Sequence, residues 1–89
     1  MEYIVEEKYK KMVETIKAHT TAELREKVVR AIIISIQTGY AHPYLIKAGA
    51  LRKTRSKAMP VTTTDYGEAL LRTTNMGLTY ISLGKLNWR

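Results

Sequence analysis

The segment between Lys47 and Lys57 is rich in side chains that bind phosphate. It carries five cationic residues and no acid, namely Lys47, Arg52, Lys53, Arg55 and Lys57. The planar guanidinium of arginine matches two phosphate oxygens at once, and lysine adds a mobile point charge. The segment therefore predicts contacts with nucleic-acid phosphates. Such binding weakens as salt is raised, because each neutralised phosphate releases counterions.

The remaining charge has the same one-sided distribution. The formal net charge is +7, yet residues 1–30 are nearly neutral, with six acids against seven bases. From residue 31 onward, two acids stand against eight bases. A field of this kind attracts polyanions, so we expect Arg72 and Lys85 to support the nucleic-acid contacts. A solvated loop, or a docking surface for an acidic protein, would carry similar charges.

No set of residues has the spacing of a catalytic or metal site. His19 and His42 lie too far apart in sequence for a helical metal-binding pair, and the chain has no cysteine. Asp65 and Glu68 stand at an expected helix start, where capping and the helix dipole explain them. Residues 77–86 superficially resemble a phosphate-binding loop, but the spacing of their glycines is wrong. The sequence therefore predicts a protein that is not an enzyme and has no metal ion or cofactor.

The aromatic residues indicate a second kind of contact. The chain has six tyrosines, one tryptophan and no phenylalanine. Tyrosine suits half-buried positions, because its ring packs while its hydroxyl stays in water. Such side chains stack on unpaired bases and also anchor protein–protein interfaces. The candidates for a partner interface are Tyr40, Tyr44, Tyr66, Tyr80 and Trp88.

Two amphipathic helices are expected in the N-terminal part. Apolar residues recur at helical spacing in residues 2–18 and again in residues 24–36. Thr20 followed by Glu23 is typical of a capping box at the start of the second helix. Gly39 is a typical helix stop. The short connection favours an antiparallel helical hairpin.

The rest of the chain predicts shorter elements. Pro43 suits the first turn of a short helix, which Gly49 weakens or ends. The basic residues then form either a loop or a helix end. A further helix begins at Asp65, and the β-branched and aromatic residues at 78–83 indicate a strand.

These elements predict one small, mainly helical domain, with an α+β arrangement as an alternative. Residues 1–39 form the helical hairpin, and residues 40–60 form a short helix and the basic loop. Residues 61–89 form a helix and a short C-terminal strand or β-hairpin. Residues 62–81 resemble a winged-helix module, in which a recognition helix runs into a strand. The preceding link is about a dozen residues, however, longer than a helix-turn-helix uses.

The expected function is non-enzymatic binding of DNA or RNA, chiefly through phosphates. The alternative is an assembly or inhibitor protein whose basic surface and tyrosines dock on an acidic partner, or a homo-oligomer. Small size alone suggests a phage or viral accessory protein, with a cytoplasmic or virion-associated location. The acidic N-terminus is unlike a signal peptide, and the longest apolar run, residues 31–36, is too short to span a bilayer. We therefore expect no membrane partner.

Overall fold

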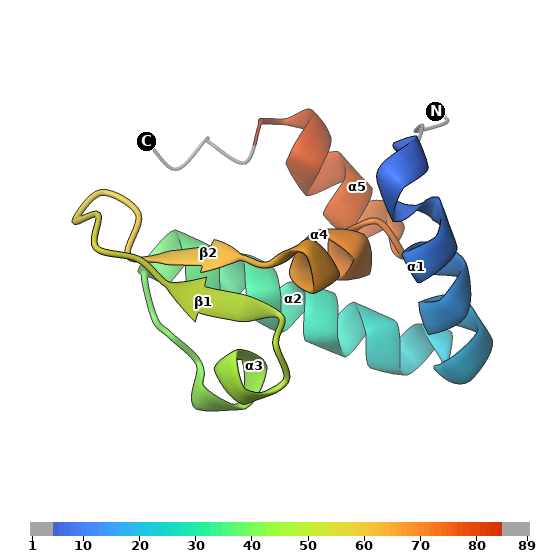
Figure 1. Ribbon diagram of the computed structural model, residues 1–89, viewed down its shortest axis with the longest axis horizontal. Helices are drawn as coiled ribbons and strands as arrows, with labels where there is room; N and C mark the ends of the chain where they lie inside the picture. Colours follow the sequence, from blue (N-terminus) through green and yellow to red (C-terminus); the bar gives the residue numbers. More distant parts are fainter. Residues whose placement is uncertain (1–4, 85–89) are drawn as a thin grey trace.

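The fold is taken from a computed structural model that describes residues 5–84 (Figure 1). In order, the elements are α1 (Glu7–His19), α2 (Ala22–Thr38), α3 (Pro43–Lys47), β1 (Leu51–Lys53), β2 (Val61–Thr63), α4 (Asp65–Leu71) and α5 (Asn75–Ser82). The described part of the chain is thus mainly helical with one short antiparallel β-hairpin. This confirms the expected fold class.

Side-chain caps set the start of four helices. A threonine hydroxyl accepts a hydrogen bond from the backbone N–H three residues later at α2, α4 and α5, from Thr21, Thr64 and Thr74 respectively. His42 caps α3 through Nδ1. The capping residue of α2 is one position later than expected, because the hydroxyl of Thr20 instead donates to the last turn of α1.

The helices α1 and α2 do not form the antiparallel hairpin that the sequence predicted. The link between them is short, but α1 turns away and packs mainly on α4, whereas α2 packs on α4, α5 and β2 (Figure 1). The reason is that α4, α5 and β2 cover the apolar face of α2. Val29 and Ile32 of α2 are fully buried. The apolar stripe of α1, with Val13 and Ile16, therefore covers α4 instead.

The C-terminal strand expected at residues 78–83 is absent, and these residues belong largely to α5. The hydroxyl of Thr74 accepts a hydrogen bond from the N–H of Gly77 at 2.9 Å and starts the helix. Packing against α2 and α4 then outweighs the strand preference of the β-branched residues, which is a weak local effect. The winged-helix arrangement is wrong for the same reason, since α4 is followed by a helix.

The β-hairpin lies in the middle of the chain. Leu51 pairs with Thr63, and Lys53 pairs with Val61. Leu51 and Val61 are 2% and 1% exposed, so each strand contributes one buried residue to the core. The strands are only three residues long, and these two residues fix their position on the helices.

Two glycines allow backbones to touch. A Cβ atom at Gly77 would lie 2.5 Å from the carbonyl carbon of Leu71 and closer still to its oxygen. A Cβ atom at Gly67 would lie 3.1 Å from the carbonyl carbon of Ala50 and would overlap its oxygen. The first turn of α5 therefore rests on the last turn of α4, and α4 rests on the chain entering β1.

Candidate nucleic-acid interface

The basic segment forms the outer part of the β-hairpin (Figure 1). Arg52 and Lys53 lie on β1, and Arg55 and Lys57 lie in the loop 54–60 that joins the strands. All four side chains are exposed. The loop projects from the body of the protein at the left of Figure 1. The segment is therefore a strand and a loop, where the sequence left open a loop or a helix end.

Hydrogen bonds within the loop hold its shape. The N–H of Thr54 donates to the carbonyl oxygen of Pro60 at 2.8 Å and closes the loop. The hydroxyl of Thr54 donates to the carbonyl of Met59 and accepts from the N–H of Ser56 at 3.1 Å. The Ser56 hydroxyl accepts from the N–H of Met59, also at 3.1 Å. This ordering of the backbone lowers the entropy that the loop would lose on binding.

The hairpin belongs to a stretch of chain that has no carboxylate. Residues 27–64 contain seven cations and no acid. They form most of α2, all of α3 and the hairpin, which lie together on the left side of Figure 1. Lys47 is exposed in the last turn of α3, and α3 packs beside β1. Lys47 and the four hairpin cations are thus brought to one part of the molecule.

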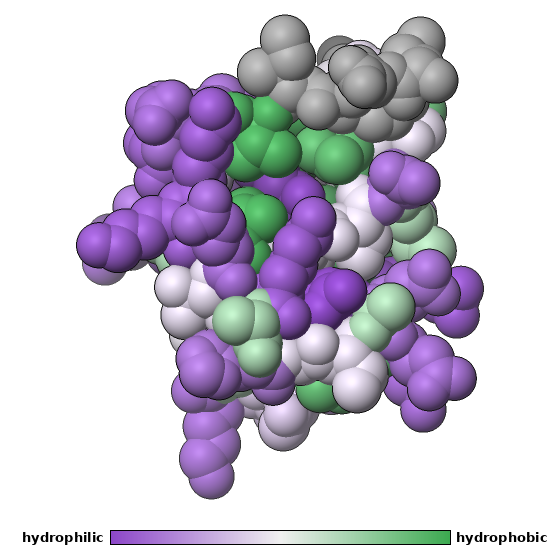
Figure 2. All heavy atoms as spheres, turned by 90° about the vertical axis from the view of Figure 1, so that its right-hand side faces the viewer, coloured by the Kyte–Doolittle hydropathy of each residue, from purple (hydrophilic) through white to green (hydrophobic). Residues whose placement is uncertain are grey.

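The opposite side of the molecule has a different surface. Figure 2 shows that hydrophilic side chains dominate much of the face to which α1 contributes. The exposed residues of α1 include both signs, with Lys10 paired to Glu7 at 3.3 Å. Mixed charge of this kind does not attract a polyanion as strongly as the acid-free hairpin does.

The prediction that Arg72 contacts phosphate is wrong. Its side chain is buried, and its Nε and Nη2 donate to the two carboxylate oxygens of Glu6 at 2.6 and 3.0 Å. Its Nη1 donates to Oε1 of Glu68 at 2.8 Å. The guanidinium also lies 4.1 Å from the ring centroid of Tyr9. Arg72 is therefore a structural cation that ties the start of α1 to α4.

The pairing changes the acid–base properties of both partners. Burial alone would lower the pKa of Arg72, but its hydrogen bonds with Glu6 and Glu68 outweigh burial and raise it. The hydrogen bond from Arg72 lowers the pKa of Glu6 from 4.5 to about 2. Both groups are therefore charged over the physiological pH range.

We expect this pair to make the free energy of unfolding depend on acid pH. The folded-state pKa of Glu6 lies below its unfolded value of 4.5, so its contribution is complete above that pH and is lost as the pH falls towards 2. The Glu6 side chain is 54% exposed, and solvent screening limits the contribution to about 1 kcal/mol. Urea unfolding of the protein and of Glu6→Gln at pH 7 and pH 2.5 measures it.

The difference between the two proteins should shrink at the lower pH. Glu7→Gln is the matched control, because the Glu7 side chain is 89% exposed and forms a surface pair with Lys10. Equal stability of Glu6→Gln and the unaltered protein at pH 7 would contradict the expected role of Glu6.

The prediction that Tyr80 belongs to a partner interface is also wrong. It is buried in α5, and no hydrogen-bond partner for its hydroxyl is found among the described residues. Burial raises the pKa of Tyr80, and the nearby charge of Glu68 adds to the effect. Tyr80 is therefore a core residue. Lys85 and Trp88 lie outside the described residues.

The other three tyrosines predicted for the partner interface are exposed. The exposed fractions of Tyr40, Tyr44 and Tyr66 are 57%, 66% and 41%. His42 lies between the first two, with ring centroids 5.7 Å from Tyr40 and 6.5 Å from Tyr44. In the sequence, His42 was considered only as a metal ligand and was excluded by its distance from His19. The alternating Tyr-x-His-x-Tyr pattern was the signal that could have placed it here.

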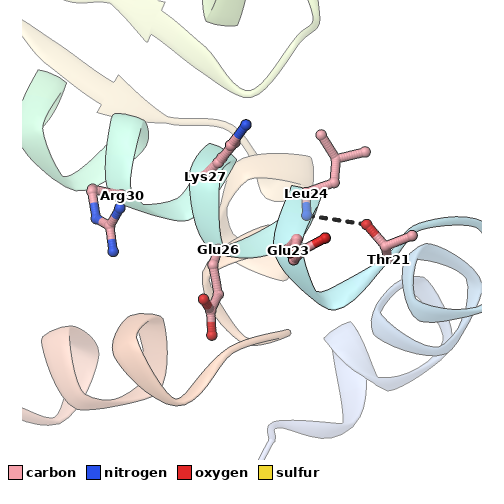
Figure 3. A pocket seen from close by; sticks show the side chains of 6 residues that line it. All are labelled: Thr21, Glu23, Leu24, Glu26, Lys27 and Arg30. Carbon is pink, nitrogen blue, oxygen red and sulfur yellow. Dashed lines mark hydrogen bonds between the residues drawn. The ribbon is translucent and has the colours of Figure 1, made fainter.

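An apolar groove of about 140 Å³ lies between α2, α3 and α4. The large exposed side chains that line it are Leu24, Tyr44 and Tyr66. A larger hollow of about 430 Å³ lies along the first turns of α2. Figure 3 shows that its side chains come from α2 and the residue before it, and that Glu26, Lys27 and Arg30 point in different directions. The charged side chains of that hollow therefore do not converge on one point.

Comparison of the chain with protein-family models, with curated proteins and with solved structures finds no match. Within residues 5–84, no three His, Asp or Glu side chains are grouped so that they could hold a metal ion. In the same range no helix has the length and apolar character needed to cross a membrane. The function is therefore inferred from the residues of this chain.

Proposed function

We propose that this protein binds nucleic acid, DNA or RNA, through the phosphates, using the β1–β2 hairpin. Arg52, Lys53, Arg55 and Lys57 make the main contacts, with Lys47 in support. The observation that carries the proposal is the exposure of four cations on one ordered hairpin. The stretch around it, residues 27–64, has no acid. Lys85 remains a predicted supporting contact.

The shape of the hairpin supports this role. A two-stranded ribbon is narrow enough to enter the major groove of a duplex, and it can equally follow a single backbone. Leu51 on β1 and Val61 on β2 fix the two strands in the core, so contacts made by the loop do not have to order the strands. Contacts to phosphate alone give affinity without sequence preference.

Replacing Arg52, Lys53, Arg55 and Lys57 together by alanine should weaken binding to all sequences by about 100-fold near 100 mM salt. With four to six phosphates contacted, log K should fall with log salt at a slope of roughly −3 to −5, and the variant should flatten that slope. Fluorescence anisotropy with labelled duplex and single-stranded DNA and RNA over several salt concentrations measures both quantities.

The matched control replaces four exposed lysines of α1 by alanine, namely Lys8, Lys10, Lys11 and Lys17. It lowers the net charge by the same amount on another element. If the control weakens binding as much as the hairpin variant does, the overall charge is responsible and the hairpin is not the site. An affinity for nucleic acid that the hairpin substitutions leave unchanged would also contradict the proposal.

A second candidate function is docking on an acidic protein or on another copy of the chain. The observation that favours it is the apolar groove with Leu24, Tyr44 and Tyr66 exposed along it. Aromatic side chains of this kind commonly anchor protein interfaces. Measurement of the mass in solution tests self-association, and a monomer at all concentrations would remove the homo-oligomer from consideration.

A further inference from the structure

We infer that the nucleic acid bound by the hairpin is single-stranded, and that its unpaired bases stack on Tyr40 and Tyr44. This inference rests on the proposed function, because it adds base contacts to the phosphate contacts of the hairpin. It names the class of nucleic acid, which charge alone does not.

The two tyrosines and His42 form a row on an ordered backbone. The N–H of Tyr40 donates to the carbonyl of Ser35 at 3.0 Å, and the N–H of His42 donates to that of Tyr40 at 2.9 Å. The Nδ1 atom of His42 accepts from the N–H of Tyr44 at 3.2 Å, which helps to fix the imidazole between the two tyrosines. The aromatic row therefore has a defined shape before anything binds.

Within the row, no ring is stacked on the ring faces of the two tyrosines. The interplanar angles are 59° for Tyr40 with His42 and 73° for His42 with Tyr44, so the rings do not stack on one another. More than half of each tyrosine is exposed. A flat partner can therefore still cover a tyrosine ring, and every nucleobase offers such a face.

The row lies beside the hairpin. Gly39, directly before Tyr40, is so close to the end of the hairpin loop that a Cβ atom there would lie 3.0 Å from Cγ of Pro60. At the other end, Tyr44 belongs to α3, which packs on β1. The segment that carries the aromatic row therefore adjoins the hairpin, and one strand can contact both.

The inference of a single strand follows from the accessibility of the bases. In a duplex the bases are paired and stacked on one another, so their faces are closed to a protein side chain unless the helix is opened. An unpaired strand offers both its phosphates and its base faces. A protein surface could also cover the tyrosines, but the acid-free chain around them favours a polyanion.

The test compares three labelled ligands of equal length at one salt concentration: a mixed-sequence DNA single strand, the same backbone without bases, and a duplex. The single strand should bind at least about tenfold more tightly than the baseless strand. Tyr40→Ala with Tyr44→Ala should lose about 10- to 100-fold in affinity for the single strand. The same variant should bind the baseless strand and the duplex as the unaltered protein does, with an unchanged salt slope.

The matched control is Tyr40→Phe with Tyr44→Phe, which keeps the rings and removes the hydroxyls. It should bind the single strand as tightly as the unaltered protein. An equal loss in the Phe and Ala variants would assign the effect to the hydroxyls and overturn the stacking inference. Circular dichroism of both variants checks the fold.

The failures of the two proposals are distinguishable. If the hairpin variant loses affinity but the single strand and the baseless strand bind alike, stacking is overturned and the phosphate proposal stands. Stacking is likewise overturned if the Tyr-to-Ala variant binds the single strand normally, even when those tyrosines prove to anchor a protein partner. If the hairpin substitutions change the affinity for none of the three ligands, the proposed function is wrong. The inference of base stacking, which rests on it, is then wrong too.

Discussion

Adding one methyl group at Gly77 should lower the free energy of unfolding by about 3 kcal/mol or more. The new Cβ atom would lie 2.5 Å from the carbonyl carbon and 2.8 Å from the Cα of Leu71, and it would overlap the carbonyl oxygen. These are backbone atoms, so relief requires α5 to move away from α4. Helix preference alone predicts the opposite sign, since alanine is better than glycine by about 1 kcal/mol in a helix. The contact is the larger effect.

Gly49→Ala is the matched control for Gly77→Ala. Gly49 has a φ of +83°, yet no atom lies within 4 Å of a Cβ atom placed there. The free energy of unfolding of that variant should fall only by the cost of placing alanine in the left-handed backbone conformation, about 1–2 kcal/mol. Urea unfolding followed by circular dichroism compares the two. A Gly77→Ala variant at least as stable as Gly49→Ala would contradict the close approach of α4 and α5.

Arg72→Leu should lower the free energy of unfolding by about 3–5 kcal/mol, because it removes a buried guanidinium from its ion pairs with two carboxylates. The side chain of Glu68, one of these partners, is 13% exposed and lies 2.8 Å from Nη1 of Arg72. The substitution also removes the two bonds to Glu6 and the contact with the ring of Tyr9. Thermal and urea unfolding measure the loss, and the affinity of the folded fraction for nucleic acid should not change.

A double-mutant cycle isolates the buried charge as the cause. Glu68→Gln removes the negative charge. The double variant Arg72→Leu with Glu68→Gln should therefore lose less free energy of unfolding than the two single variants lose together. Arg72→Lys keeps the charge but cannot bridge both oxygens of Glu6, and it should fall between the unaltered protein and Arg72→Leu. Strict additivity in the cycle would show that the charge of Glu68 does not cause the loss of stability in Arg72→Leu.

The local sequence predicted much of the fold, and its errors have physical causes. Helices near α1, α2, α3 and α4 followed from apolar spacing, Gly39, Pro43 and Asp65. The strand at 78–83 was wrong, because β preference is weaker than a capped helix start and packing on two helices. The β-hairpin was missed because its loop carries no Asn-Gly or Asp-Gly pair to mark a turn.

The candidate site was predictable where its residues are close in sequence. The basic segment could be read from composition because its cations follow one another within a single hairpin. Arg72 was misassigned because its partner Glu6 is 66 residues away in sequence. The i,i+4 spacing of Glu68 and Arg72 was a local signal that could have indicated an ion pair. Tyr80 was misassigned because burial of one ring in a short helix depends on how α5 crosses α4.

The tie between Glu6 and Arg72 spans 66 residues of chain, and this separation has a consequence for synthesis. During translation α1 emerges before α4, the element on which it mainly packs. At 5–20 residues per second, the 66 residues that follow Glu6 up to and including Arg72 take roughly 3–13 s to be made. For that interval the apolar stripe of the nascent helix lacks its main native cover.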